Sequence, residues 1–169
     1  MPHIHGLNKT TLLDYPGRVA ATIFLGGCNF RCPFCQNAGL VLRPDEEPVI
    51  PEDDVLAFLK KRRRVLDGVC ITGGEPTLEA ELPELIRSIK ELGYLVKLDT
   101  NGTHPAIVRK LTEEKLIDYV AMDIKSSREH YARLAGNSSE KLLATVEETA
   151  AFLMEGNLDY EFRTTVVRE

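Results

Sequence analysis

Residues 19–35 read Val-Ala-Ala-Thr-Ile-Phe-Leu-Gly-Gly-Cys-Asn-Phe-Arg-Cys-Pro-Phe-Cys, and this stretch decides the fold. Its first part, Val19–Leu25, is a short apolar run that predicts a buried strand. Two glycines follow, and then a loop that carries Cys28, Cys32 and Cys35. In barrels and open sheets of parallel strands, chemistry collects at the carboxyl ends of the strands. The stretch therefore predicts a parallel sheet with a functional site at one edge.

After this stretch, short runs rich in β-branched residues alternate with longer amphipathic segments. The runs predict four further strands, over Gly68–Thr72, Tyr94–Asp99, Tyr119–Ile124 and Tyr160–Val167. The amphipathic patterns predict helices over Pro51–Arg64, Glu79–Leu92, Pro105–Leu111 and Ser139–Glu155. This alternation is typical of βαβ units, so the fold class is α/β with a parallel sheet.

The composition limits the function classes. The chain has 169 residues, 43% of them hydrophobic and 28% charged, which is enough for one domain with a sizeable core. The net charge of −5 argues against a nucleic-acid surface, and the basic run Lys60–Arg64 is interpreted as a solvated helix end. No apolar run reaches the roughly 18 residues that span a bilayer. We predict a cytoplasmic protein that binds neither nucleic acid nor membrane, with an N-terminal arm or hairpin over residues 1–18 before a domain over 19–169.

Polar groups recur at the end of every predicted strand. The second strand is followed by Gly73-Gly74-Glu75-Pro76, and the third ends in Asp99-Thr100-Asn101-Gly102. The fourth ends in Asp123-Ile124-Lys125, and the fifth contains Arg163. Because parallel strands bring their carboxyl ends to one edge, we predict a single active site there.

Three clustered cysteines in a protein of this kind indicate a metal centre. With Cys70 as a fourth ligand they could form a structural zinc site, whereas three thiolates alone would leave one iron of a cubane cluster open for a substrate or cofactor. Cys70 lies in a buried-strand pattern, where cysteine is a small hydrophobic side chain, and this favours the second alternative. The histidines are scattered, and we interpret each as a surface or turn residue: His3, His5, His104 and His130.

Several strings together resemble a known superfamily. Cys28-x3-Cys32-x2-Cys35, with Phe34 before the last cysteine, resembles the radical S-adenosylmethionine (SAM) signature, and Gly73–Pro76 looks like the SAM-binding motif of the same superfamily. Leu-Leu-Asp-Tyr-Pro-Gly at 12–17 and the stretch 27–37 are similar to glycyl-radical activating enzymes, closest to the anaerobic ribonucleoside-triphosphate reductase activating proteins. Pyruvate formate-lyase activating enzymes are near relatives.

The resemblance implies a partial (β/α) TIM-type barrel of the radical SAM kind. The last predicted strand corresponds to the fifth of six in that barrel, and the chain stops at Glu169. We therefore expect the barrel over 19–169 to be truncated at its carboxyl end.

The resemblance also implies roles for individual residues. Cys28, Cys32 and Cys35 would hold a [4Fe–4S] cluster whose unique iron binds SAM. Further SAM contacts are implied for Phe34, Gly73, Gly74, Glu75, Asp99, Lys125 and Arg163. A monovalent cation beside SAM is implied for Asp99, Thr100, Met122 and Asp123. The ordinary alternatives are carboxylates that cap the turns after strands, and salt-bridge partners for the two basic residues.

The function implied by the resemblance is that of a glycyl-radical activase. Reduction of the cluster would cleave SAM into methionine and a 5′-deoxyadenosyl radical, which takes a hydrogen atom from a glycine of a partner enzyme. The implied partner is anaerobic ribonucleotide reductase, with an electron donor of the flavodoxin or ferredoxin type. Three alternatives are an activase of pyruvate formate-lyase or another glycyl-radical enzyme, a radical SAM enzyme acting on a small molecule such as a carboxydeazaguanine synthase, and a metal-stabilised binding module.

Overall fold

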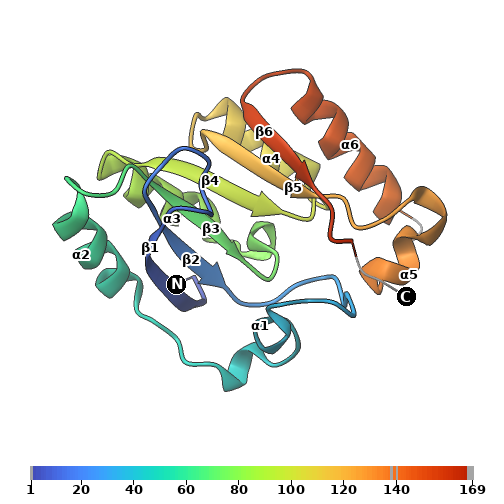
Figure 1. Cartoon of the computed structure of the whole chain (residues 1–169), viewed down its shortest axis with the longest axis horizontal. Coiled ribbons are helices and arrows are strands. Elements are labelled where there is room, and N and C mark those ends of the chain that lie inside the picture. Colours follow the sequence, from blue (N-terminus) through green and yellow to red (C-terminus); the bar gives the residue numbers. More distant parts are fainter. Residues whose placement is uncertain (1, 138, 140, 167–169) are drawn as a thin grey trace.

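A single curved sheet of six strands forms the centre of the molecule (Figure 1). The computed structural model describes residues 2–137, 139 and 141–166. The strands are β1 (Ile4–Thr11), β2 (Ala20–Leu25), β3 (Gly68–Gly73), β4 (Leu95–Thr100), β5 (Tyr119–Asp123) and β6 (Asp159–Arg163). They lie side by side in chain order, with β1 antiparallel to β2 and all other neighbours parallel. The predicted α/β class with a parallel sheet is confirmed, and a partial barrel is consistent with this sheet.

Helices connect the parallel strands. The longer ones are α2 (Glu52–Arg62), α3 (Leu82–Glu91), α4 (Pro105–Glu113) and α6 (Leu142–Met154), close to the predicted ranges. Acidic residues fill the first turn of α2 and basic residues its last turn, which complements the helix dipole. Short helices are α1 (Ala38–Leu42) and α5 (Tyr131–Ala135), with 3-10 turns at Pro44–Glu46, Pro76–Leu78 and Arg128–His130. Within the described residues, no helix is long and apolar enough to cross a membrane.

The structure corrects two predictions about local structure, the end of the last strand and the surroundings of His5. The last strand ends at Arg163, so the predicted extension through Val166 is wrong, and Val167 lies outside the described residues. Residues 4–11 form β1, a full strand of the sheet on the outer side of β2. The half-buried His5 lies within this strand and therefore not in a turn or on the surface. The division at residue 18 into an arm and a barrel stays a prediction.

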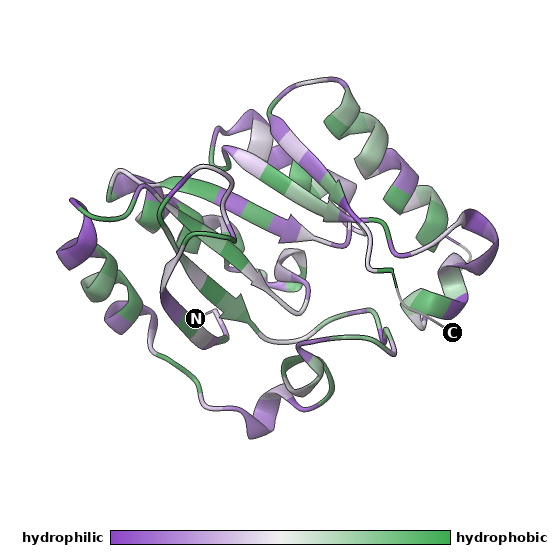
Figure 2. Ribbon diagram, in the orientation of Figure 1, coloured by the Kyte–Doolittle hydropathy of each residue, from purple (hydrophilic) through white to green (hydrophobic). Residues whose placement is uncertain are grey.

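Alternation along the strands separates an apolar face from a polar one. The apolar face carries residues of the main core such as Ile23, Ile71, Val96, Leu98 and Val120, all fully buried. The residues between these positions in each strand point their side chains to the opposite, concave face of the sheet. Figure 2 shows the result as mainly apolar colouring in β2 and β3, and a mixture of polar and apolar residues in β4, β5 and β6.

The segment between β1 and β2 folds against the amino ends of the parallel strands. Tyr15 in this segment is buried, with its ring 5.9 Å from the ring of Tyr119 and in contact with Gly68. Asp14 accepts a hydrogen bond from the Thr22 hydroxyl on β2 at 2.5 Å. The segment 12–17 therefore covers one end of the concave face and leaves the carboxyl ends of the strands open.

Candidate functional site

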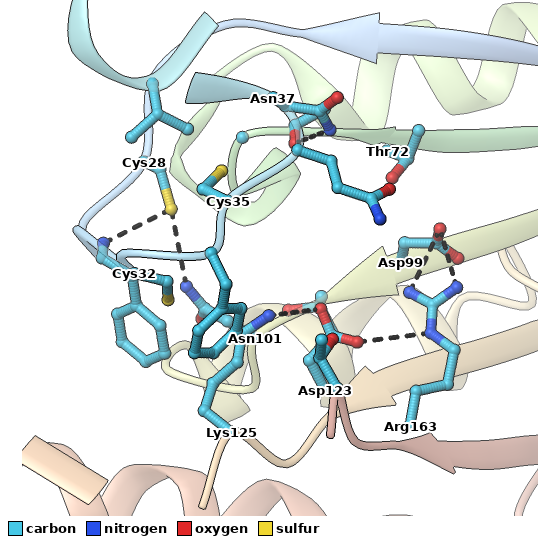
Figure 3. A pocket seen from close by; sticks show the side chains of 18 of the residues that line it. Cys28, Cys32, Cys35, Asn37, Thr72, Asp99, Asn101, Asp123, Lys125 and Arg163 are labelled. Atoms are coloured by element: carbon cyan, nitrogen blue, oxygen red, sulfur yellow. Dashed lines mark hydrogen bonds and ion pairs between the residues drawn. The ribbon is translucent and has the colours of Figure 1, made fainter. Parts of the chain in front are cut away.

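A cavity of about 470 Å³ lies at the carboxyl ends of the parallel strands. The arrowheads of β2–β6 point toward the side of the molecule where α1 and α5 lie (Figure 1). The lining includes the three clustered cysteines, Gly73 and Gly74 after β3, the ends of β4 and β5, and Arg163 of β6. The structure thus brings most of the predicted site residues into one space, as Figure 3 shows.

Cys28, Cys32 and Cys35 are free thiols, each half-buried and each facing this cavity. Burial raises the pKa of Cys28 to about 11 and also raises the pKa of Cys32. Their loop is tied to the rest of the chain by backbone hydrogen bonds, from the Gly27 amide to the Leu40 carbonyl at 2.9 Å and from the Arg31 amide to the Ala135 carbonyl at 2.7 Å. The short helices α1 and α5, which the sequence did not predict, therefore hold the cysteine loop.

Gly74 lets the end of β3 lie directly against the cysteine loop. A Cβ atom at Gly74 would be 1.8 Å from the Gly27 carbonyl oxygen, so no other residue fits there without a backbone shift. The Glu75 amide donates to the same carbonyl at 2.8 Å. Asn37, just before α1, donates to the Gly73 carbonyl at 2.8 Å (Figure 3). The glycines thus join two motifs that are far apart in the sequence.

Glu75 differs from its neighbours because it does not line the cavity. Its side chain is 1% exposed, and burial raises the pKa of its carboxyl group. Its oxygens accept hydrogen bonds from the Thr77 amide at 3.1 Å, the Thr100 hydroxyl at 2.8 Å and the Asn101 amide at 2.6 Å, and a further one from the Thr77 hydroxyl. In this structure Glu75 connects the ends of β3 and β4, and its contact with SAM stays a prediction.

Asn101 is a site residue to which the sequence analysis gave no role. Its side-chain amide donates to the side-chain oxygen of Asn29 at 2.8 Å. It also approaches the Cys28 sulfur at 3.9 Å (Figure 3). Asn29 in turn donates to the Thr103 hydroxyl at 2.9 Å. The end of β4 is thereby fixed to the cysteine loop. The sequence signal that could have identified this pair is its position, since Asn29 lies within the cysteine motif and Asn101 within the motif at the end of the third predicted strand.

Charged side chains from β4, β5 and β6 form the other wall of the cavity. Arg163 lies between two carboxylates, 3.3 Å from both Asp99 and Asp123 (Figure 3). Lys125 pairs with Asp123 at 2.8 Å, and the fully buried Lys97 pairs with Asp99. Lys97 was missed, although its spacing of two residues from Asp99 in the predicted strand puts both on one face.

The remaining predicted residues lie in varied surroundings. Phe34 is half-buried in the wall of the cavity. Thr100 lines the cavity, but its hydroxyl donates a hydrogen bond to the buried Glu75. Met122 is buried in the core. Cys70 is also fully buried, in β3, and does not line the cavity. This separation from the other cysteines disfavours the four-cysteine zinc site.

Two of the other histidines lie on the surface as predicted, and one is more buried than expected. His3 and His130 are exposed. His104 lies in the turn before α4 but is half-buried, with Nδ1 2.9 Å from the Thr77 hydroxyl.

The donor set fits an iron–sulfur cluster that keeps one coordination position open. Three thiols of one loop face a shared cavity, and among the described residues the fourth cysteine is the buried Cys70. The Phe30 amide donates to the Cys28 sulfur at 3.3 Å, a kind of hydrogen bond that is typical around cluster thiolates. The cavity beside the thiols is lined by backbone and charged groups that suit a zwitterionic cofactor.

Comparisons with known proteins agree with this geometry. Residues 22–154 match the family model described as the radical SAM superfamily. A protein of Methanocaldococcus jannaschii, provisionally named a glycyl-radical enzyme activating enzyme, is 36% identical over 169 residues, which cover 97% of this chain and 68% of the relative. A second protein of that organism with the same provisional name is 27% identical and covers 98% of this chain, which spans 58% of its length.

A solved structure extends the agreement to three dimensions. The chain is similar to a histidine-tagged protein called anSMEcpe with bound AdoMet, with a TM-score of 0.57 and 25% identity. The match covers 81% of this chain and 40% of that protein.

Proposed function

The chain belongs to the radical SAM superfamily, and we propose that it is the enzyme that activates a glycyl-radical enzyme. The cofactors of the superfamily are a [4Fe–4S] cluster and SAM. The observation that carries the proposal is the convergence of three free thiols and the Gly73-Gly74 backbone on one cavity. The names of the two Methanocaldococcus relatives support the activase assignment.

Each wall of the cavity has a part in the proposal. Cys28, Cys32 and Cys35 would hold the cluster, which when bound supplies the electron for reductive cleavage of SAM. The backbone at Gly73 and Gly74 would approach the methionine part of SAM closely, because neither residue has a side chain. Phe34, Asp99, Lys125 and Arg163 would orient the rest of the molecule, and Glu75 would act by fixing Thr100 and Asn101 at the end of β4.

The chain itself would protect a radical formed in the cavity. The segment 12–17 closes the amino end of the concave face, with Tyr15 packed on Tyr119, so that access is from the carboxyl ends of the strands. With that end covered, water and competing hydrogen donors can reach the cavity from one side only. Limiting such access is the protein's contribution when a cofactor carries the reactive chemistry.

The finer proposal is that the partner is anaerobic ribonucleoside-triphosphate reductase. It rests on the similarity of the strings at 12–17 and 27–37 to the activating proteins of that reductase. The electron donor would be a flavodoxin- or ferredoxin-type protein, and the location the cytoplasm, where low-potential donors and free thiols are both maintained.

Electron paramagnetic resonance tests this function. The chain, loaded anaerobically with iron and sulfide and then reduced, is mixed with SAM and with either anaerobic ribonucleotide reductase or pyruvate formate-lyase from the same source. We expect a glycyl-radical doublet on the reductase and none on the lyase. A doublet on the lyase alone would mean that the chain is an activase of pyruvate formate-lyase. The absence of a doublet with either enzyme would contradict the activase function.

A further inference from the structure

The two carboxylates implied as a cation site have no oxygen free for a metal ion. The Asp123 oxygens face Arg163 Nε at 3.3 Å and Lys125 Nζ at 2.8 Å. One Asp99 oxygen faces both terminal nitrogens of Arg163 at 3.3 Å, and the other is bound by Lys97 Nζ. Each of the four oxygens thus has a cationic nitrogen of the chain as its partner.

Lys97 is the unusual member of this group. Its side chain is completely buried and comes from the middle of β4, two residues before Asp99 on the same face. Besides Asp99, its ammonium group lies 3.8 Å from Glu161 of β6 and 5.9 Å from the ring centre of Tyr119. Lysine side chains are rarely buried unless they are paired with an opposite charge, and here the two carboxylates provide that pairing.

The charges of this wall already balance. Asp99, Asp123 and Glu161 are opposed by Lys97, Lys125 and Arg163, which gives three negative and three positive groups. A metal ion between the two aspartates would have to displace one of the nitrogen atoms and would add a positive charge without a counter-charge. In a partly buried site such an unbalanced charge is costly. The donor set therefore does not fit a monovalent cation.

We propose that Lys97 is a built-in counter-ion that replaces the monovalent metal ion at Asp99 and Asp123. An ammonium group on the chain is covalently held, whereas a metal ion dissociates. The affinity of this chain for SAM is then independent of whether K⁺ or Na⁺ is present. Lys97 is a positioning residue, because it fixes Asp99 and through it Arg163.

The test compares SAM binding in different salts. Equilibrium binding of SAM to the cluster-loaded chain is measured anaerobically in KCl, NaCl and tetramethylammonium chloride at equal ionic strength. For the wild type we expect the same dissociation constant in all three salts within about two-fold. For Lys97→Met, which removes the charge and keeps the length, we expect weaker binding that K⁺ or Na⁺ restores by about five-fold or more, the usual range for a coupled ligand.

The matched control is Lys90→Met. Lys90 also pairs with an aspartate, Asp118 at 2.7 Å, but the pair does not line the cavity. This variant should bind SAM like the wild type in every salt. A wild type whose SAM affinity rises about five-fold in K⁺ or Na⁺ over tetramethylammonium would overturn the inference, and so would a Lys97→Met variant that no salt restores.

A second measurement separates this inference from the proposed function. Line broadening of the ²³Na resonance is recorded with the cluster-free wild type, Lys97→Met and the more conservative Lys97→Gln. Broadening that K⁺ reverses is expected only in the two variants, and its presence in the wild type would overturn the inference. A chain that fails to activate any partner would contradict the proposed function and leave this result unaffected.

Discussion

At the scale of single residues, the site depends on buried polar groups whose partners come from other strands. Glu75 is the clearest case, because its carboxylate is enclosed and receives hydrogen bonds from Thr77, Thr100 and Asn101. Lys97 is a second case, with its partners on β4 and β6. Such groups fix the ends of the strands relative to one another and so hold the cavity in shape.

Glu75→Gln tests this role. An amide can replace one carboxylate oxygen, but its NH₂ group faces the donors that the other oxygen accepted. We expect a loss of about 2 kcal/mol in the free energy of unfolding, measured by urea denaturation. Glu113→Gln, at an exposed position of α4, is the control and should change stability by less than about 0.5 kcal/mol. Equal stability of the two variants would mean that the Glu75 hydrogen bonds do not hold the strand ends.

The sequence predicted the identity of site residues better than their contacts. The cysteines and the strand-end motifs could be identified because their residues lie close together in the sequence. The contact of Lys97 with Glu161 and the pairing of Asn29 with Asn101 were not predicted, because each joins residues that are far apart in the chain. Glu75 was expected to face SAM, and only the three-dimensional structure reveals that it is enclosed.

At the scale of elements, the cysteine loop is held by four neighbours, one of which is α1 through the Leu40 carbonyl. The end of β3 contacts it through Gly74, the end of β4 through Asn101, and α5 through the Ala135 carbonyl. The strands and the long helices were predictable from periodicity. The helices α1 and α5 were not, since each has only five residues and too few turns to form a pattern.

Gly74→Ala tests the contact between β3 and the cysteine loop. The added methyl group would overlap the Gly27 carbonyl, so we expect a loss of about 2 to 3 kcal/mol in stability and a large fall in iron bound per chain after anaerobic reconstitution. Gly93→Ala is the matched control. Its φ of +87° makes alanine strained, but beyond its two chain neighbours no atom of the described residues lies within 4 Å of the new methyl group. It should lose stability by about 1 kcal/mol and bind iron normally; normal iron content in Gly74→Ala would refute the role of this contact.

The segment 12–17 is attached to the sheet through Tyr15, and this attachment depends on pH. Burial raises the pKa of Tyr15 from 10.0 to about 12 in the folded chain. Because the pKa of Tyr15 is higher in the folded than in the unfolded chain, its contribution to stability is complete below pH 10. This contribution is lost as the pH rises from 10 to about 12.

Comparison with Tyr15→Phe isolates this effect, since phenylalanine does not titrate. We expect the stability advantage of the wild type over Tyr15→Phe to be constant at neutral pH and to decrease between pH 10 and about 12. Urea denaturation at each pH gives the stability, and the absorbance of tyrosinate at 295 nm gives the ionisation of tyrosine. An advantage that is constant up to pH 12 would exclude a raised pKa for Tyr15.

At the scale of the whole molecule, one curved sheet assembles the site from five parallel strands. Residues from Asp14 to Thr165 line the same cavity, so nearly the whole chain separates the first contribution from the last. The chain spans 68% and 58% of the lengths of the two Methanocaldococcus relatives. That a sixth parallel strand is lacking stays a prediction.

The most direct test of the central claim is reductive cleavage of SAM at this cavity. The anaerobically reconstituted, dithionite-reduced chain is incubated with SAM, and 5′-deoxyadenosine and methionine are measured by chromatography, beside the variants Cys32→Ala and Cys70→Ala. The prediction is that the wild type and Cys70→Ala each form 5′-deoxyadenosine and methionine in equal amounts, and that Cys32→Ala forms neither. Intact SAM with the cluster-loaded wild type, or cleavage that survives Cys32→Ala, would contradict it.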